Sequence, residues 1–374
     1  MNQRDPQALP GKRLPLEPVR RPGRWLRLLV GTVMAFFALI VIGIIALNVY
    51  LATRPAPKLV KAAGIISIPA PFRMGRPFID YLTISGNYLY AAYASAGLAG
   101  VVDMATNQVA ATVGGLPRAH GVAVIADRNL GYASSSGDNT VGVFNLKTYK
   151  LLQKIPGGSD PDAIIYDEAA HLVYAADHDG KTATLIDPAT QRVVATVPLG
   201  GEAEYPQADP STGLIYQNLE DTSEVVVVDP VKQAVIKRYK VAPGEGPTGL
   251  ALDAANHRLF CATRNQQLVV LNEDTGQVVA ALPIGAGVDG AGYDPGLHRV
   301  YTANAVGTMT VIQQDSADRY RVLENAATHF GGHSLAVDPV THRVYVAYFG
   351  SIAVYDAVVN AAAAPHGQGS LASP

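Results

Sequence analysis

Cysteine, charged residues and basic runs are all scarce in this chain of 374 residues. Cys261 is the only cysteine, which excludes an intramolecular disulfide and a metal site built from several cysteines. Only 16% of the residues are charged and 48% are hydrophobic, a balance that excludes a disordered protein. The 36 Gly and 25 Pro residues argue against a long helical bundle and indicate many turns.

Local catalytic motifs are absent as well. The sequence has no Ser-His-Asp order, no phosphate-binding glycine loop and no CxxCH haem-attachment motif. It also lacks a local metal-ligand motif such as HExxH. A site in this chain therefore depends on residues that the fold brings together.

The charges divide the chain into a basic N-terminal part and an acidic main body. Residues 1–61 carry ten Lys or Arg and two Asp or Glu, whereas residues 62–374 carry nineteen and twenty-nine. A nucleic-acid ligand requires clustered basic side chains that release counterions from its phosphates. The main body has no basic run, which argues against nucleic acid as a partner.

An uncharged apolar run covers residues 28–53, which exceeds the length of about 20 residues that a transmembrane helix needs. Seven basic residues precede it and three follow it, so the positive-inside bias predicts that residues 1–27 form a cytoplasmic tail. We expect residues 28–53 to be an uncleaved signal anchor in the membrane, followed by a linker over 54–61. A cleavable signal peptide is the alternative, but its apolar region has only about 7–15 residues. Both a signal anchor and a signal peptide place the main body in the periplasm or outside the cell.

Seven repeats follow the apolar run, and in each an aromatic residue begins a short strand. These aromatic anchors lie 41–44 residues apart and are Tyr90, Tyr132, Tyr174, Tyr216, Phe260, Tyr301 and Tyr345. A period of about 40–45 residues built from short alternating strands is typical of a β-propeller with four-stranded blades. The sequence therefore predicts an all-β, seven-bladed propeller over residues 62–356, followed by a disordered tail over 357–374.

The seventh repeat contains only three strands, and the missing fourth strand is expected near the start of the propeller. Residues 64–69 (GIISIP) resemble the fourth-strand segments ATVPLG and QKIPGG of other repeats. We expect this strand to complete blade seven. It would close the ring by pairing both exposed edges.

The strands of these repeats also carry a family resemblance. The segments YTAN at 301–304, YAAD at 174–177 and YVAY at 345–348 resemble the YVTN repeat of seven-bladed, YncE-like propellers, as does TLIDPATQRVVATVPLG. The resemblance spans about residues 62–356. It implies the fold and leaves the function open, because such propellers serve as ligand-binding, scaffolding and enzymatic modules.

A ring of polar residues is expected at one mouth of the central channel, where the innermost strand of each blade begins. Counting twelve residues back from each anchor gives Phe78, His120, Asp162, Glu204, Thr248, Asp289 and His333. Asp80 would share the side of Phe78 and stand in for the first blade. Small residues follow the ring and leave room for close packing: Gly121, Ala163, Gly249, Gly290 and Ser334. Loops on the same face add Arg76, Arg118, Asp160, His178, Arg264, Asn304 and His329.

Two interpretations of this ring compete. The candidate metal ligands are His120, His333, Asp162 and Asp289, a set that suits a divalent Zn, Mn or Fe ion. With a metal, the ring would serve a hydrolase or lyase in which Glu204 or an aspartate acts as general base. Without one, it is a hydrated channel in which His and Asp pair across blades. The second interpretation is favoured, so we expect a small molecule or a protein to bind at the mouth. A scaffold role is a further alternative.

The other notable residues have simpler interpretations. Four histidines lie three residues before an anchor and are expected in hairpin turns on the opposite face: His171, His257, His298 and His342. Cys261 directly follows the anchor Phe260 and is interpreted as a strand residue rather than a nucleophile.

Overall fold

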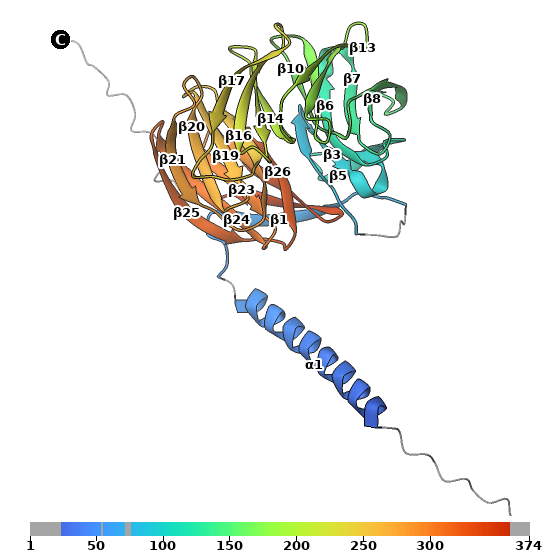
Figure 1. The fold of residues 1–374 in the computed structure, drawn as a ribbon, viewed down its shortest axis with the longest axis vertical. Helices are drawn as coiled ribbons and strands as arrows, with labels where there is room; N and C mark the ends of the chain where they lie inside the picture. Colours follow the sequence, from blue (N-terminus) through green and yellow to red (C-terminus); the bar gives the residue numbers. More distant parts are fainter. Residues whose placement is uncertain (1–23, 54, 72–75, 360–374) are drawn as a thin grey trace, which may run out of the picture. The chain divides into compact units, whose positions relative to one another are not determined.

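The computed structural model describes residues 24–53, 55–71 and 76–359. These residues form two units, an N-terminal one with a single helix and a second one that contains all the described strands (Figure 1). The predicted cytoplasmic tail over 1–27 and C-terminal tail over 357–374 fall mostly outside the described residues.

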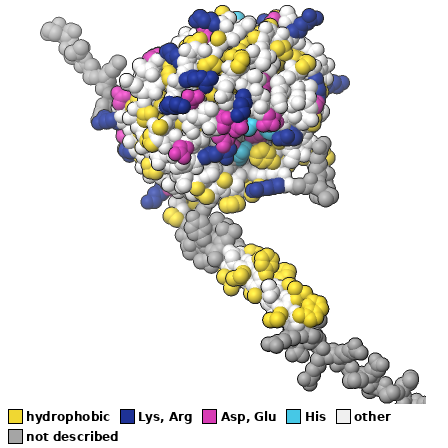
Figure 2. All heavy atoms as spheres, viewed as in Figure 1, with side chains coloured by type: hydrophobic (Ala, Val, Ile, Leu, Met, Phe, Trp, Pro, Cys, Tyr) yellow, Lys and Arg dark blue, Asp and Glu magenta, His cyan; other side chains and the backbone are white. Residues whose placement is uncertain are grey.

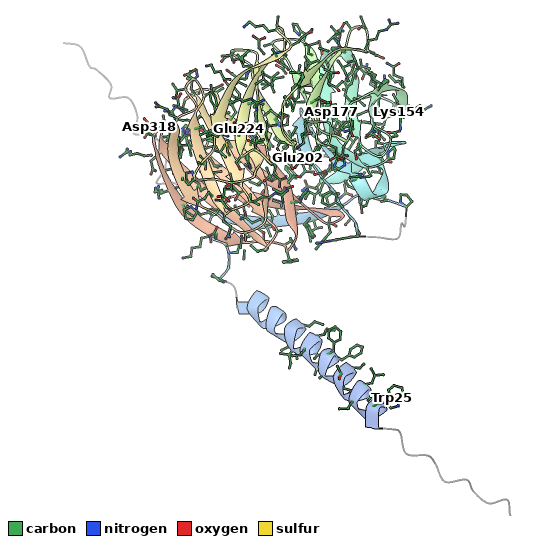
Figure 3. The ribbon with its side chains drawn as sticks, viewed as in Figure 1. Trp25, Lys154, Asp177, Glu202, Glu224 and Asp318 are labelled. Atoms are coloured by element: carbon green, nitrogen blue, oxygen red, sulfur yellow. The ribbon has the colours of Figure 1, made fainter. Side chains whose placement is uncertain are left out.

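The N-terminal unit is helix α1 (Arg24–Thr53), which is long and apolar enough to cross a membrane. Its 30 residues span about 45 Å at the rise of an α-helix. The helix starts four residues before the predicted apolar run because Arg24 and Arg27 are good helix formers. Trp25, labelled in Figure 3, is exposed at its N-terminal end.

The second unit is a seven-bladed propeller in which each described sheet has four antiparallel strands. Blade one contains β2 (Leu82–Ser85), β3 (Tyr88–Tyr93), β4 (Leu98–Asp103) and β5 (Gln108–Gly114). Blade two contains β6 (Ala119–Ile125), β7 (Leu130–Ser135), β8 (Thr140–Asn145) and β9 (Leu151–Pro156). Blade three contains β10 (Pro161–Asp167), β11 (Leu172–Asp177), β12 (Thr182–Asp187) and β13 (Arg192–Pro198). Two short 3₁₀ turns, η1 (Ala94–Ala96) and η2 (Ala126–Arg128), lie in the first two blades.

The next three blades repeat the same order of strands. Blade four contains β14 (Ala203–Asp209), β15 (Leu214–Leu219), β16 (Glu224–Asp229) and β17 (Ala234–Lys240). Blade five contains β18 (Pro247–Asp253), β19 (Arg258–Thr263), β20 (Gln267–Asn272) and β21 (Val278–Pro283). Blade six contains β22 (Val288–Asp294), β23 (Arg299–Asn304), β24 (Thr308–Ser316) and β25 (Arg319–Ala327).

Blade seven joins the two ends of the propeller. It contains β26 (Gly332–Asp338), β27 (Arg343–Tyr348), β28 (Ser351–Ala357) and, as its outermost strand, β1 (Val60–Ser67). In Figure 1 the blue strand β1 lies among the red strands of the other end of the chain. The strand begins four residues before the predicted range 64–69, so the predicted linker contributes its last two residues. It starts there because the buried Val60 pairs with Ala357.

The aromatic anchors pack against the neighbouring blade, which explains why the repeat carries them. Tyr174 of blade three contacts the apolar cluster of blade four that includes Ile215 and Val226. Tyr345 of blade seven is buried with Leu82 and Leu89 of blade one, so the same kind of contact joins the last blade to the first. A blade cannot bury its face alone, and the anchor couples it to the next one.

The four turn histidines adopt left-handed backbone conformations, with φ of 55° at His171, 55° at His257, 51° at His298 and 61° at His342. Histidine is among the few residue types that populate this region. Each lies between the innermost strand of a blade and the next strand, at the end away from the ring. Cys261 is fully buried in β19, and burial raises the pKa of its thiol.

Candidate functional site

A β-bulge marks the start of the innermost strand in blades two to seven. The ring residues there are the second residues of their strands, namely His120, Asp162, Glu204, Thr248, Asp289 and His333. In all six strands the pairing register shifts beside the ring residue. A bulge bends its strand and changes the direction of a side chain. The repeated bulge therefore gives six blades the same local geometry at the mouth.

Blade one departs from this pattern, because the pairing of β2 with β3 has no register shift. Asp80, ten rather than twelve residues before its anchor Tyr90, takes the ring position and is buried. Phe78 also reaches the mouth, where its ring packs edge-on against His333 with centroids 4.6 Å apart. The next residue after Asp80 is held to blade two, since the Tyr81 backbone N–H donates to the His120 carbonyl oxygen at 3.0 Å.

The small residues after the ring reflect how closely neighbouring blades approach. A Cβ added at Gly249 would lie 2.6 Å from the backbone nitrogen of Ala291. At Gly290 it would lie 2.8 Å from the backbone nitrogen of Leu335. Both distances are shorter than any real contact, so these positions exclude larger residues and keep the ring narrow.

The ring and its neighbours line one cavity of about 220 Å³, here called the cup. Its lining consists of Phe78, Asp80, Tyr81, His120, Asp160, Asp162, His178, Glu204, Arg264, Asp289 and His333. Figure 2 shows acidic and histidine side chains gathered on one face of the propeller. The cup therefore concentrates titratable groups that are far apart in the sequence.

Alternating carboxylate and imidazole groups form an ion-pair chain along the wall of the cup. In order it consists of Asp162, His120, Asp80, His333 and Asp289. His120 Nδ1 lies 3.0 Å from Asp162 Oδ1 and also contacts Asp80 Oδ2. His333 Nε2 lies 3.0 Å from Asp80 Oδ1, and its Nδ1 lies 2.8 Å from Asp289 Oδ2. Asp80 is central, because each of its oxygens faces a different histidine.

This arrangement favours doubly protonated histidines. Burial opposes charge on His120, but hydrogen bonds to Asp162 and Asp80 outweigh it and raise the pKa of His120 to about 10. Burial likewise opposes charge on His333, yet the charges and hydrogen bonds of Asp289 and Asp80 raise its pKa well above the ordinary value. Burial also opposes ionisation of Asp80, but both histidines together lower its pKa to about 2. His120, Asp80 and His333 therefore hold alternating charges near neutral pH.

Blade four adds the carboxyl group of Glu204, which has no imidazole as close to it as those of the ion-pair chain are to their carboxylates. The Tyr81 hydroxyl lies 3.1 Å from Glu204 Oε2 and 3.3 Å from Asp162 Oδ2, so it connects Glu204 to the ion-pair chain. The closest described imidazole nitrogen, His178 Nε2, is 3.7 Å from Glu204 Oε1. Burial, and then the charges of Asp289 and Asp162, raise the pKa of Glu204 well above its ordinary value.

Five of the predicted mouth residues are not among those that line the cup, namely Thr248, Arg76, Arg118, Asn304 and His329. Asn304 is buried and donates to Thr308 and Thr310, and His329 stacks on Tyr348 with ring centroids 4.4 Å apart. Thr248 is fully buried and donates its hydroxyl to the Val288 carbonyl oxygen at 3.3 Å. Arg76 lies over the ring of Phe349 at 4.3 Å, where a cation–π contact holds it. Arg118 is exposed and lies 4.0 Å from Asp160. By contrast, His178 and Arg264 do line the cup.

The four predicted metal ligands do not form one compact group. Among the described residues, Asp80 completes one group with His120 and Asp162 and another with His333 and Asp289, each with ligand atoms within 4.8 Å. Neither of these groups contains both histidines. Moreover, both ring nitrogens of His333 face carboxylate oxygens, and His120 Nε2 lies 2.9 Å from Ser136 Oγ. A metal ion would have to displace protons that these contacts stabilise.

Tyr81 and Ser136 contact the ion-pair chain but have no place in the predicted ring. Tyr81 lines the cup, and Ser136 Oγ lies within hydrogen-bond distance of His120 Nε2. Alternation along a strand places neighbouring residues on opposite faces, which argues against Asp80 and Tyr81 in one site. Alternation fails here because both residues precede the first residue of β2, Leu82. The only available signal was the position of Tyr81 beside Asp80.

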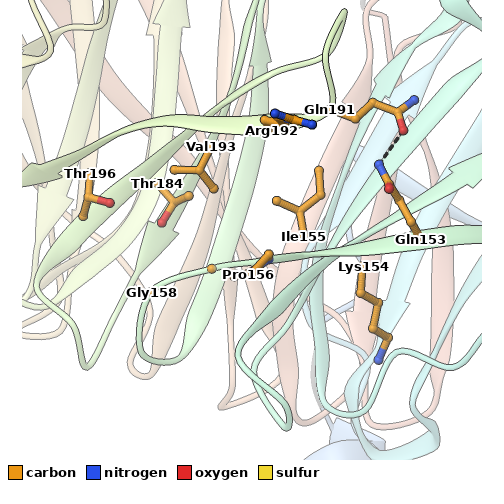
Figure 4. A pocket seen from close by; sticks show the side chains of 11 residues that line it. Gln153, Lys154, Ile155, Pro156, Gly158, Thr184, Gln191, Arg192, Val193 and Thr196 are labelled. Carbon is orange, nitrogen blue, oxygen red and sulfur yellow. Dashed lines mark hydrogen bonds between the residues drawn. The ribbon is translucent and has the colours of Figure 1, made fainter.

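A larger cavity of about 550 Å³ lies between the outer strands of blades two and three (Figure 4). Gln153 and Gln191 hydrogen-bond across it at 2.5 Å. Its basic residues are Lys154, which pairs with Asp138, and Arg192. Since its lining contains no carboxylate, histidine or cysteine, this groove offers less chemistry than the smaller cup.

Comparison with known proteins supports the fold. No family model and no curated protein sequence matches the chain. Among solved structures, hydrazine synthase from Kuenenia stuttgartiensis has a TM-score of 0.66 and 15% sequence identity. The match covers 77% of this chain and 98% of that one. At this identity the likeness concerns architecture alone, so the chain is a seven-bladed β-propeller preceded by an apolar helix of membrane-spanning length.

Proposed function

We propose that this chain is a membrane-anchored binding propeller of the YVTN, YncE-like type and that it takes a small polar ligand in the cup. One observation carries the proposal: five blades contribute to an ion-pair chain that borders an open cavity. Structural stability alone does not explain such an arrangement, because burying charges costs free energy that well-packed apolar residues avoid. Binding does explain it, because the chain presents fixed charges to a solute.

The size of the cup favours a small molecule over a folded partner. Its volume of about 220 Å³ is less than that of most pockets for drug-sized ligands. Innermost strands surround it, so a partner protein would enter with a single side chain at most. The scaffold alternative has no comparable feature in its support.

A metal-dependent hydrolase or lyase is supported less well by the same residues. Both histidines favour the doubly protonated state, in which a ring nitrogen has no lone pair for a metal. Among the described residues, the carboxyl groups of Asp289 and Glu204 can contact a ligand while both histidines keep their protons. Recognition by charge and hydrogen bonds therefore fits the site better than metal coordination.

Membrane attachment outside the cytoplasm is part of the proposal. Its support is the length of α1 together with the excess of basic residues before the apolar run. We expect protease added outside spheroplasts to digest the propeller. Complete protection would contradict this location.

The binding proposal is tested by replacing one charge at the end of the ion-pair chain. Full-length protein in detergent is mixed with small metabolites, separated from unbound compounds by gel filtration and examined by mass spectrometry. We expect Asp289→Asn to retain the bound compound about tenfold less than wild type, because a charged hydrogen-bond partner is lost. Asp315→Asn is the control, since Asp315 pairs with Arg321 away from the cup. Equal retention by all three proteins would exclude the cup as the site.

A further inference from the structure

The central channel contains two separate cavities with a pair of tyrosines between them. The cup includes Tyr81 in its lining, whereas a second cavity of about 280 Å³ includes Tyr205. The two rings pack together with centroids 5.0 Å apart. Tyr81 is only 5% exposed although it borders the cup. The tyrosine pair therefore forms a floor, and a ligand in the cup enters and leaves through the mouth.

The hydrogen-bond donors of His120 and His333 on the wall of the cup are already used within the protein. His120 donates to the chain carboxylates and to Ser136, and His333 donates to Asp80 and Asp289. Arg264 Nη2 donates to Glu220 Oε2 at 2.8 Å. The acceptors left to face a ligand are carboxyl oxygens of Asp162 and Asp289, whereas the raised pKa of Glu204 favours its protonated form, which can also donate. A ligand that pairs with the oxygens of Asp162 and Asp289 must bring its own donors.

Tyr81 determines how these acceptors are arranged. Its hydroxyl lies within hydrogen-bond distance of both Asp162 and Glu204, so it keeps two acidic groups side by side at the bottom of the cup. Its aromatic ring and that of Phe78 also belong to the lining. Aromatic faces attract cations, in particular where water is partly excluded. Two independent features, carboxyl acceptors at Asp162 and Asp289 and aromatic walls, favour the same kind of ligand.

We infer that Tyr81 is the specificity-determining floor of the cup and that the ligand is a compact amine, bound through its protonated nitrogen. This inference rests on the proposed binding function and deepens it. The ammonium group would donate to carboxyl oxygens of Asp289 and of the pair that Tyr81 joins. An anion would meet the same oxygens and be repelled. A bulky chain would be stopped by the tyrosine floor.

The test is a ligand-observed NMR titration of the full-length protein in detergent with ethylammonium. Tyr81→Phe removes only the hydroxyl, and Tyr205→Phe is the matched control, because Tyr205 keeps its ring against Tyr81 and lines the other cavity. We expect ethylammonium to bind wild type and Tyr205→Phe equally and Tyr81→Phe about tenfold more weakly. Tetramethylammonium, which carries charge but no N–H donor, and acetate are expected not to compete. A thermal unfolding curve establishes that each variant is folded.

Several results would overturn the inference. Equal binding of ethylammonium to Tyr81→Phe and wild type would remove Tyr81 as the selective residue. Competition by tetramethylammonium would show that N–H donors do not decide binding. Competition by acetate would show that the charge of the ligand does not decide it. Displacement of ethylammonium by Zn²⁺ alone would favour a metal site. If a metabolite of another class is retained in an Asp289-dependent way, the amine inference fails and the proposed function stands. If nothing is retained and ethylammonium does not bind, both fail.

Discussion

Deleting residues 60–67 is expected to abolish the cooperative unfolding of the propeller. These residues form β1, the outermost strand of blade seven, which pairs along its length with β28 from the other end of the chain. Its loss would expose the edge of β28 and separate Val60 and Ile66 from the apolar clusters around them. Circular dichroism during denaturant titration measures this. A single sharp transition of unchanged midpoint would show that β1 does not close the ring.

Two neighbouring point variants separate closure from a general effect of mutation. Ile66 is 3% exposed and packs with residues of blades one and seven, whereas Ile65 is 54% exposed on the same strand. Ile66→Asp is expected to destabilise the propeller by more than about 4 kcal/mol, because it buries an unpaired charge. Ile65→Asp should change stability by no more than about 0.5 kcal/mol. Similar unfolding midpoints for both would contradict the register of β1 against β28.

Replacing Asp80 by Asn is expected to be the most damaging change in the cup. Asp80 is the shared partner of His120 and His333, and its side chain is only 6% exposed. Removing one member of a buried charged network costs about 3–5 kcal/mol, because the remaining charges lose their partner. Asp315→Asn, at a surface ion pair with Arg321, is expected to cost less than about 1 kcal/mol. Denaturant unfolding at pH 7 measures both, and equal costs would contradict the central place of Asp80.

The same network predicts how stability depends on pH. His120 has a raised pKa, so its contribution is complete below its ordinary value of 6.5 and is lost as the pH rises through about 10. Asp80 has a lowered pKa, so its contribution is present above its ordinary value of 3.8 and is lost as the pH falls through about 2. The combined contribution of His120 and Asp80 to the stability of the wild type is therefore expected to be largest between about pH 4 and 6.5. Asp80→Asn should weaken both dependences.

The repeat made most of the architecture predictable. Aromatic anchors such as Tyr132 and Tyr174 recur every 41–44 residues because each blade must pack against the next, and the seven anchors indicate seven blades. The constant offset of His120 and His333 from their anchors follows from the bulge that six innermost strands share. Whatever repeats in the structure is visible as a repeat in the sequence.

The parts of the site that do not repeat were not predictable in the same way. Blade one lacks the bulge, so the offset identifies Phe78, and Asp80 could be proposed as its substitute only from its place two residues further along the chain. Tyr81 precedes the strand, where alternation no longer tells which way a side chain lies. The loop arginines Arg76 and Arg118 depend on contacts with Phe349 and Asp160, which no local pattern encodes. Side-chain pairing across blades requires the three-dimensional arrangement.

The protonation state of His120 and His333 is the property that most directly separates a charge-based binding cup from a metal centre. Side-chain ¹⁵N NMR of the full-length protein measures this protonation state. The variants His120→Gln and His333→Gln assign the signals, and Asp80→Asn serves for comparison. We expect both wild-type rings to be doubly protonated at pH 8, with His120 titrating near pH 10 and at lower pH in Asp80→Asn. Neutral rings that titrate near pH 6.5, or a ring nitrogen shifted by a bound metal ion, would contradict the ion-pair chain and the function proposed from it.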